Sequence, residues 1–165
     1  ILESSTLTSS ISLVSYPKLN KCSSHCLIHI LYKFLHTYTN IETLDLRNDS
    51  LANHKGINYI ETDLSAIMQQ PDCIITNPPF NVAMEIINKA LSDVADGGYV
   101  IMLLRLNFFG SKTRKPFWTH NLPMCCYVHS ERMKFTNTGG TDSIEYMHCV
   151  WKKGFNYNST ELRII

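Results

Sequence analysis

The chain has 165 residues, which is enough for a single domain with its own hydrophobic core. Hydrophobic residues make up 44% of it and charged residues 18%, a balance that excludes a disordered polar chain. The net charge of +1 excludes a strong overall attraction for nucleic acid, and no apolar run reaches the ~18 residues of a membrane span. We expect one domain over residues 1–165 and no membrane contact; because Ile1 stands where Met is usual, truncation at the N-terminus stays open.

The six cysteines favour a reducing compartment over a disulfide framework or a metal site. Cys73, Cys125 and Cys149 lie in apolar, strand-like runs, which is typical of core thiols in the cytosol. Residues 22–26 (Cys-Ser-Ser-His-Cys) offer zinc-ligand residue types, but a second ligand pair is not evident and the segment begins a helix-like stretch. We therefore expect a cytoplasmic protein without a metal.

The first half of the chain predicts one helix and two strands after an irregular start. Ile1–Glu3 has the residue types of a strand tail, whereas residues 4–20 are rich in Ser and Thr and predict an irregular segment. Residues 22–38 place apolar side chains at helical spacing. The apolar runs 41–46 and 57–60 predict two strands.

In the second half, short apolar runs alternate with amphipathic segments and turn signals. The amphipathic stretch 83–94 predicts a helix that ends before Gly97-Gly98. The wholly apolar stretch 99–104 is typical of a strand inside a parallel sheet. The remaining predicted elements are strands at 72–76, 124–128 and 143–151, the last two as a hairpin, and a short helix at 112–120.

This alternation of strands and helices predicts an α/β fold, with a mostly parallel sheet and helices on both faces. In such sheets, ligands bind at the carboxyl ends of the strands. Polar side chains fall at three of these ends: Asp45, Asp63 and Asn77. Together they predict a cofactor-binding rim, although an Asp after a strand also serves commonly as a turn former or a helix cap.

The most distinctive motif is Asn77-Pro78-Pro79-Phe80, which lies between a predicted strand and a predicted helix. Two prolines fix φ and remove two backbone N–H donors, and a residue before proline is pushed toward an extended conformation. The motif therefore predicts a stiff ledge that presents an amide side chain, free carbonyl groups and an aromatic ring. Such a ledge suits a planar group that carries an amine.

The motif resembles the catalytic Asp/Asn/Ser-Pro-Pro-Tyr/Phe/Trp sequence of the amino-methyltransferases that use S-adenosylmethionine (AdoMet). The resemblance implies a Rossmann-like class I methyltransferase fold with a late antiparallel hairpin. It implies that Asn77 and the Pro78 carbonyl hold the target nitrogen, that Pro79 stiffens the turn, and that Phe80 stacks on a flipped base. The alternative is a plain strand-to-helix turn with a buried Phe.

The same resemblance implies where AdoMet binds. Asp45 matches the acidic residue after the second strand, which binds the ribose hydroxyls, and Asp63 matches the residue that holds the adenine. Glu3 matches the acidic residue of the first strand, and Asn77 also borders the cofactor. The chain departs from the family after Glu3, because the glycine-rich loop that lets the backbone approach the ligand is missing.

The later sequence is similar to that of the small phage-type DNA N6-adenine methyltransferases, over roughly residues 41–154. The similarity lies in the order of a few residue types toward the end of the domain: Phe135-Thr136, Gly139-Gly140-Thr141-Asp142, Tyr146 and Trp151. Taken without the family, residues 138–143 form a polar turn between strands. The family resemblance instead implies that this turn is an active-site loop.

Basic and aromatic residues follow the apolar strand 99–104. Basic side chains interleaved with aromatic rings suit contacts with phosphates and bases. The alternative is a solvated helix face above core phenylalanines. The candidate nucleic-acid-binding residues are Arg105, Asn107, Phe108, Lys112, Arg114 and Lys115.

These observations predict a DNA N6-adenine methyltransferase that transfers a methyl group from AdoMet to an adenine flipped out of double-stranded DNA, in a bacterium or a phage-infected cell. Three alternatives stay open. The acceptor could be the N2 of guanine in RNA or a glutamine side chain of a protein, since both are planar amines. The chain could also be a nucleic-acid-binding module that has lost the cofactor.

Overall fold

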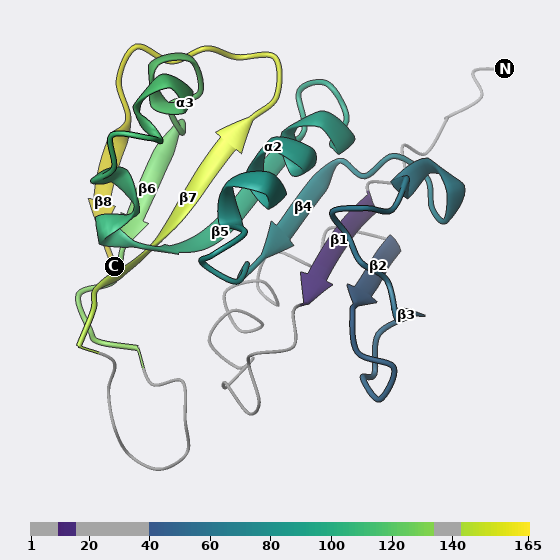
Figure 1. Cartoon of the computed structure of the whole chain (residues 1–165). Helices are drawn as coiled ribbons and strands as arrows, with labels where there is room; N and C mark the ends of the chain where they lie inside the picture. The colour runs from purple at the N-terminus through teal and green to yellow at the C-terminus, as the bar shows by residue number, and fades with distance from the viewer. Residues whose placement is uncertain (1–9, 16–39, 134–142) are drawn as a thin grey trace, which may run out of the picture.

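The computed structural model describes residues 10–15, 40–133 and 143–165 (Figure 1). These residues form one eight-stranded sheet in the order β3-β2-β1-β4-β5-β7-β6-β8. The strands are β1 (Ser10–Ser15), β2 (Asn40–Asp45), β3 (His54–Lys55), β4 (Cys73–Thr76), β5 (Tyr99–Arg105), β6 (Cys125–Val128), β7 (Tyr146–Lys152) and β8 (Glu161–Ile164). The helices are α2 (Ala83–Asp93), α3 (Lys115–His120) and two 3-10 turns, η1 (Leu64–Ala66) and η2 (Leu106–Phe109).

The sheet is parallel from β3 to β5 and changes direction at β7. β1 pairs in parallel with β2 and β4, and β4 pairs in parallel with β5. β7 is antiparallel to both β5 and β6, whereas β8 is parallel to β6. The predictions of a mostly parallel sheet and a late antiparallel hairpin are therefore confirmed.

The prediction for the N-terminal segment is wrong. Residues 10–15 were expected to be irregular, yet they form β1, which lies between β2 and β4 in the sheet. Glu3 precedes this strand, so it does not end the first strand of the sheet. Glu3 and the predicted helix at residues 22–38 lie outside the described residues. The expectation of helices on both faces depends on that helix, so it is not tested either.

The predicted strand at residues 57–60 is also wrong, because the backbone turns there. The carbonyl oxygen of Asn58 accepts hydrogen bonds from the backbone N–H groups of Glu61 and Thr62, at 3.1 and 3.0 Å. The strand in this part of the chain is β3, which ends at Lys55, before the predicted range begins. The apolar character of the run instead serves packing, since Tyr59 is fully buried and Ile57 and Ile60 lie against the core.

α2 covers the centre of the sheet, where Figure 1 shows it lying across β4 and β5. Its buried residues Ala83, Ile86, Ile87 and Ala90 recur at helical spacing. Each of the two fully buried isoleucines contributes about 1.5–3 kcal/mol of transfer free energy relative to an exposed side chain. Packing of this apolar stripe therefore fixes the helix directly after the Asn77–Phe80 ledge.

Gly98 permits the chain to return from α2 into β5. A Cβ atom at this position would lie 2.6 Å from the carbonyl oxygen of Asp72 and 2.8 Å from that of Ala95. Its neighbour Gly97 adopts a φ of 77°, which L-residues rarely adopt. The two glycines thus end the helix as predicted and set the start of β5 beside β4.

Within the described residues, no helix is long and apolar enough to cross a membrane.

Candidate functional site

The Asn77–Phe80 segment occupies the carboxyl end of β4, near the middle of the sheet. Thr76 and Pro78 are buried, while Asn77, Pro79 and Phe80 are partly exposed. The carbonyl oxygen of Pro79 accepts a hydrogen bond from the N–H of Val82 at 3.1 Å, which closes the turn before α2 begins. The segment is therefore a rigid, partly exposed connection between strand and helix, as the motif predicts.

Phe80 stacks against the side chain of Arg105. The guanidinium carbon of Arg105 lies 4.2 Å from the centroid of the Phe80 ring, and the ring of Tyr146 lies 5.9 Å from it at an interplanar angle of 39°. Arg105 ends β5 and Tyr146 begins β7, and the two residues face each other in the antiparallel register. Three elements thus meet around the Phe80 ring. We define Phe80, Arg105 and Tyr146 as the aromatic–arginine stack.

This contact changes the expected role of Phe80. The guanidinium group occupies a position where the flipped base was expected to stack. A cation–π contact of this kind contributes about 0.5–2 kcal/mol, depending on how far it is desolvated. A planar substrate therefore has to use the remaining surface of the ring or displace Arg105. Arg105 was expected to bind nucleic acid rather than to stack on Phe80. Tyr146 was not expected at the ledge, because only the strand order of the sheet brings it there.

Asp45 ends β2 and is almost completely buried, with 2% of its surface exposed. It pairs in register with Ser15, the last residue of β1. Its carboxylate accepts hydrogen bonds from Nη2 of Arg47 at 2.9 Å and from the backbone N–H of Arg47 at 2.9 Å. The hydrogen bond to Asp45 raises the pKa of Arg47. The acidic group thus lies at the predicted strand end, with Arg47 as a partner that sequence reasoning missed.

Asp63 caps the η1 turn. Its Oδ1 accepts hydrogen bonds from the backbone N–H of Ser65 at 3.0 Å and from the Ser65 hydroxyl at 2.8 Å. These bonds lower the pKa of Asp63, whose side chain is exposed. The alternative interpretation as a turn cap is confirmed for this residue. Its second carboxylate oxygen could still accept a bond from a ligand, because a carboxylate has about four lone-pair sites.

Some of the predicted nucleic-acid-binding residues are engaged in packing, whereas others lie at the surface. Arg105 shares a face of the sheet with Tyr146, because directly opposed residues of paired strands point the same way. Phe108 is buried and belongs to the core cluster that α2 covers. Arg114 donates a hydrogen bond from Nε to the Phe108 carbonyl at 2.7 Å and lies 4.3 Å from its ring. Phe108 and Arg114 are thus engaged in packing.

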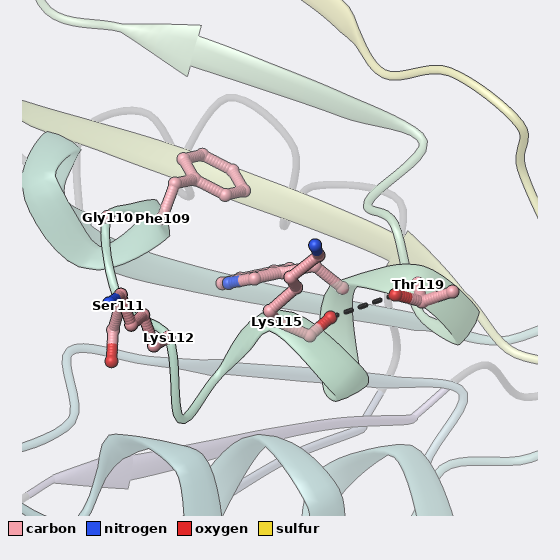
Figure 2. Close-up of a pocket in the computed structure, with 7 residues that line it drawn as sticks. Phe109, Gly110, Ser111, Lys112, Lys115 and Thr119 are labelled. Atoms are coloured by element: carbon pink, nitrogen blue, oxygen red, sulfur yellow. Dashed lines mark hydrogen bonds between the residues drawn. The ribbon is translucent and has the colours of Figure 1, made fainter.

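The two lysines remain at the surface, around a shallow hollow beside α3 (Figure 2). Lys112 and Lys115 are exposed and border the hollow together with Phe109 and Trp118. The rings of Phe109 and Trp118 lie 4.5 Å apart between centroids. Asn107 is exposed, and its carbonyl accepts a hydrogen bond from Gly110 at 3.0 Å. The hollow combines an aromatic floor with positive charge, which suits a nucleic-acid backbone.

A pair of histidines lies on the same face as Tyr146. Nε2 of His129 and Nδ1 of His148 are 2.8 Å apart. Burial and the neighbouring His129 lower the pKa of His148 to about 3, and burial lowers the pKa of His129. The pair is therefore neutral at physiological pH. Within the described residues, no group of three or more His, Cys, Asp or Glu side chains could hold a metal ion.

No protein-family model and no curated protein matches this sequence. Solved structures do match its fold. A Listeria monocytogenes protein assigned to the class I AdoMet-dependent methyltransferases aligns with a TM-score of 0.61 at 10% identity, over 97% of this chain and 60% of its own length. The chain thus spans about 60% of that protein.

Two further matches support the same fold. A protein from Lactococcus lactis assigned as a hemolysin aligns with a TM-score of 0.56 at 10% identity, over 93% of this chain and 83% of its own. The N-methyltransferase NodS of Bradyrhizobium japonicum, solved with S-adenosyl-L-homocysteine, aligns with a TM-score of 0.53 at 9% identity, over 88% of this chain and 79% of its own. At such identities the likeness concerns the fold. The chain has the Rossmann-like fold of the class I AdoMet-dependent methyltransferases.

Proposed function

We propose that the chain is an AdoMet-dependent N-methyltransferase whose acceptor is the exocyclic N6 amine of an adenine in DNA. One observation carries the proposal. In a sheet with the class I methyltransferase fold, the Asn-Pro-Pro-Phe ledge lies at the carboxyl end of β4, where open α/β sheets bind their ligands. The ledge offers an amide and carbonyl groups without two of the backbone N–H donors that would compete for them.

The cofactor site is supported by the position and chemistry of Asp45. A buried carboxylate at the end of β2, beside the end of β1, suits ribose hydroxyl groups, which donate hydrogen bonds to it. AdoMet supplies a methyl group on a sulfonium centre. Asp45 would hold the ribose, with Asn77 after the end of β4, on the other side of β1, and Asp63 at the start of the η1 turn. Glu3 and the segment after β1 lie outside the described residues, so the proposal does not depend on them.

The catalytic work of the chain is positioning. The Asn77 side-chain oxygen and the Pro78 carbonyl accept the hydrogens of the target amine, which aims the nitrogen lone pair away from the ledge. Phe80 supports the plane of the base, and Pro79 keeps these groups in fixed order. The nitrogen becomes cationic as it is methylated and loses its proton afterwards, so no base is needed beforehand. Orientation and electrostatic stabilisation then provide most of the rate acceleration.

The exposed lysines provide a route for the DNA. Lys112 and Lys115 border the hollow beside α3, and their charges suit backbone phosphates. Asn107 is exposed on the turn that leads there from β5. We place double-stranded DNA across this surface, with the target adenine flipped toward Phe80, in the cytoplasm of a bacterium or an infected cell.

One observation favours a second candidate function. The first glycine of the sequence is Gly56, so the segment between β1 and β2 contains none. A chain without glycines there could have lost AdoMet and kept nucleic-acid binding. This module would bind DNA without any response to AdoMet.

The acceptor is identified by a transfer assay. The chain is incubated with methyl-labelled AdoMet and, separately, with unmethylated DNA, RNA and a glutamine-containing protein extract, and the products are digested and analysed by mass spectrometry. We expect N6-methyladenine from DNA. N2-methylguanine or methylglutamine would replace the proposed acceptor, whereas DNA binding without transfer to any acceptor would favour the binding module.

A further inference from the structure

We propose that β8 is an interaction surface for a second copy of this chain. Two β8 strands pair antiparallel, with the Leu162 residues of the two copies opposite each other, and join two sheets into one. Three features of the strand support this pairing: its outward-facing backbone groups, its exposed apolar side chains and the order of its two charges. The pairing is independent of the proposed methyltransferase function.

The backbone of β8 is satisfied on one side only. Among the described residues, β8 is the outermost strand of the sheet and has β6 as its strand neighbour (Figure 1). Glu161 and Ile165 donate backbone hydrogen bonds, at 3.2 and 2.9 Å, to carbonyl oxygens on or directly before β6. The peptide groups of an extended strand alternate in direction, so those of Leu162 and Ile164 point away from β6. This outer edge therefore presents N–H and carbonyl groups that a further strand can bind.

The apolar side chains of β8 are exposed although they lie in a strand. Leu162 is 60% exposed and Ile164 64%. They lie opposite Cys126 and Val128 in the parallel register, so both point to the same face of the sheet. Directly opposed residues of an antiparallel pair also share a face. In the proposed pair, the two copies of Leu162 would therefore pack against each other and lose part of their contact with water.

The charged side chains of β8 are self-complementary in this arrangement. Glu161 and Arg163 are exposed and form an ion pair within the strand, with Nε and Oε1 2.8 Å apart. When two strands pair antiparallel about Leu162, Glu161 of each copy lies opposite Arg163 of the other. These positions are non-hydrogen-bonded pairs, in which side chains approach most closely. Each carboxylate then lies beside two guanidinium groups, which its about four lone-pair sites can accept.

The charge order selects one register. Pairing centred on Arg163 would also match the backbone groups, but it would place the two guanidinium groups opposite each other, and like charges directly opposite are destabilising. Pairing centred on Leu162 sets only opposite charges against each other. Because four-residue strands bury less area than the about 1,200 Å² of standard interfaces, we expect a weak dimer that forms reversibly with concentration.

Charge reversal tests the pairing. Sedimentation velocity of the full chain measures dimerisation from about 1 μM to about 1 mM, where small interfaces dissociate. Glu161→Arg and Arg163→Glu should each weaken dimerisation about tenfold, since two cross-strand pairs change from opposite to like charges. An equimolar mixture of the two variants should dimerise as the intact chain does, because arginines of one copy then face glutamates of the other. Glu85→Arg, at an exposed residue of α2, is the matched control and should have no effect.

A cysteine cross-link tests the register. The Cα atoms of a hydrogen-bonded antiparallel pair are about 5.5 Å apart, a distance that a disulfide spans. With oxidised glutathione as the exchange reagent, Leu162→Cys should therefore form a covalent dimer beyond the level of the intact chain. Ile164→Cys is the control, because its two copies would lie four residues apart along the strands, or about 13 Å.

Four results would overturn the proposal. The intact chain could stay monomeric over the whole concentration range, or the two charge variants could dimerise as well as the intact chain. The mixture of variants could fail to recover the dimer although both melt at the temperature of the intact chain. Finally, Ile164→Cys could cross-link as readily as Leu162→Cys. Recovery in the mixture, together with a cross-link at Leu162→Cys alone, would establish the antiparallel β8 pair.

Discussion

Arg47 contacts both carboxylate oxygens of Asp45, with Nη2 2.9 Å from Oδ2 and Nε 3.3 Å from Oδ1. The side chain of Arg47 is 34% exposed and that of Asp45 only 3%, so the ion pair closes the buried acidic group toward solvent. In the proposed cofactor site, ribose hydroxyl groups and Arg47 would share or compete for the same oxygens. Substitutions of Arg47 and Asp45 can therefore test the proposed cofactor site.

We predict that Arg47→Gln tightens AdoMet binding several-fold while it lowers the free energy of unfolding by about 1 kcal/mol, since one partly exposed ion pair is lost. Asp45→Asn should abolish most of the binding. Isothermal titration calorimetry with AdoMet measures both effects, and Asp96→Asn, at an exposed residue, is the matched control. Weaker binding by Arg47→Gln would show that the arginine supports the cofactor rather than competing with it.

The histidine pair predicts a loss of stability in mild acid. The native pKa of His148 is lowered to about 3, whereas an unfolded histidine titrates near 6.5. The unfolded chain therefore binds one more proton between these values, and stability falls as the pH drops below 6.5. At pH 5 the cost is about 2 kcal/mol. Urea denaturation at pH 7.5 and 5 should show this difference, and His148→Gln should reduce it; an unchanged difference in that variant would contradict the assignment.

Arg114 and Lys112 are predicted to have different roles although both belong to the same basic segment. Arg114→Ala removes the hydrogen bond to the Phe108 carbonyl and the ring contact, so we expect the melting temperature to fall by several degrees. Lys112→Ala removes an exposed charge and should leave the melting temperature unchanged. DNA affinity should respond in the opposite sense, with the larger loss in Lys112→Ala. Thermal melts that shift equally in the two variants would refute this division.

Much of the second half of the fold could be predicted from the sequence. β4, β5 and α2 are specified locally, by apolar runs, by helical spacing and by Gly97-Gly98. β1 was missed although half of Ser-Ile-Ser-Leu-Val-Ser is apolar, because the strand lies inside a longer segment rich in Ser and Thr that predicts irregular structure. Pairing with β2 on one side and β4 on the other defines this strand, and such long-range pairing leaves no mark in its own residues.

The candidate site, like the fold, could be predicted from the sequence only in part. The ledge and Asp45 fall at strand ends as expected, because both depend on local sequence. The contact of Arg105 with Phe80 depends on which strands are neighbours, and the position of Tyr146 depends on β7 entering the sheet between β5 and β6. Asp63 shows the converse: it was expected to follow a strand at residues 57–60, but no strand forms there, and its hydrogen bonds to Ser65 make it the cap of η1.

The most direct test of the methyltransferase account compares the intact chain with Asn77→Ala. Transfer of labelled methyl groups from AdoMet to unmethylated DNA is measured for both, together with AdoMet affinity and the melting temperature. We predict that the variant remains folded and retains most of its AdoMet affinity, but loses at least a hundredfold in transfer rate, since the amine loses the side chain that orients it. Transfer at an undiminished rate by the Asn77→Ala protein would contradict the assignment of the ledge as the catalytic site.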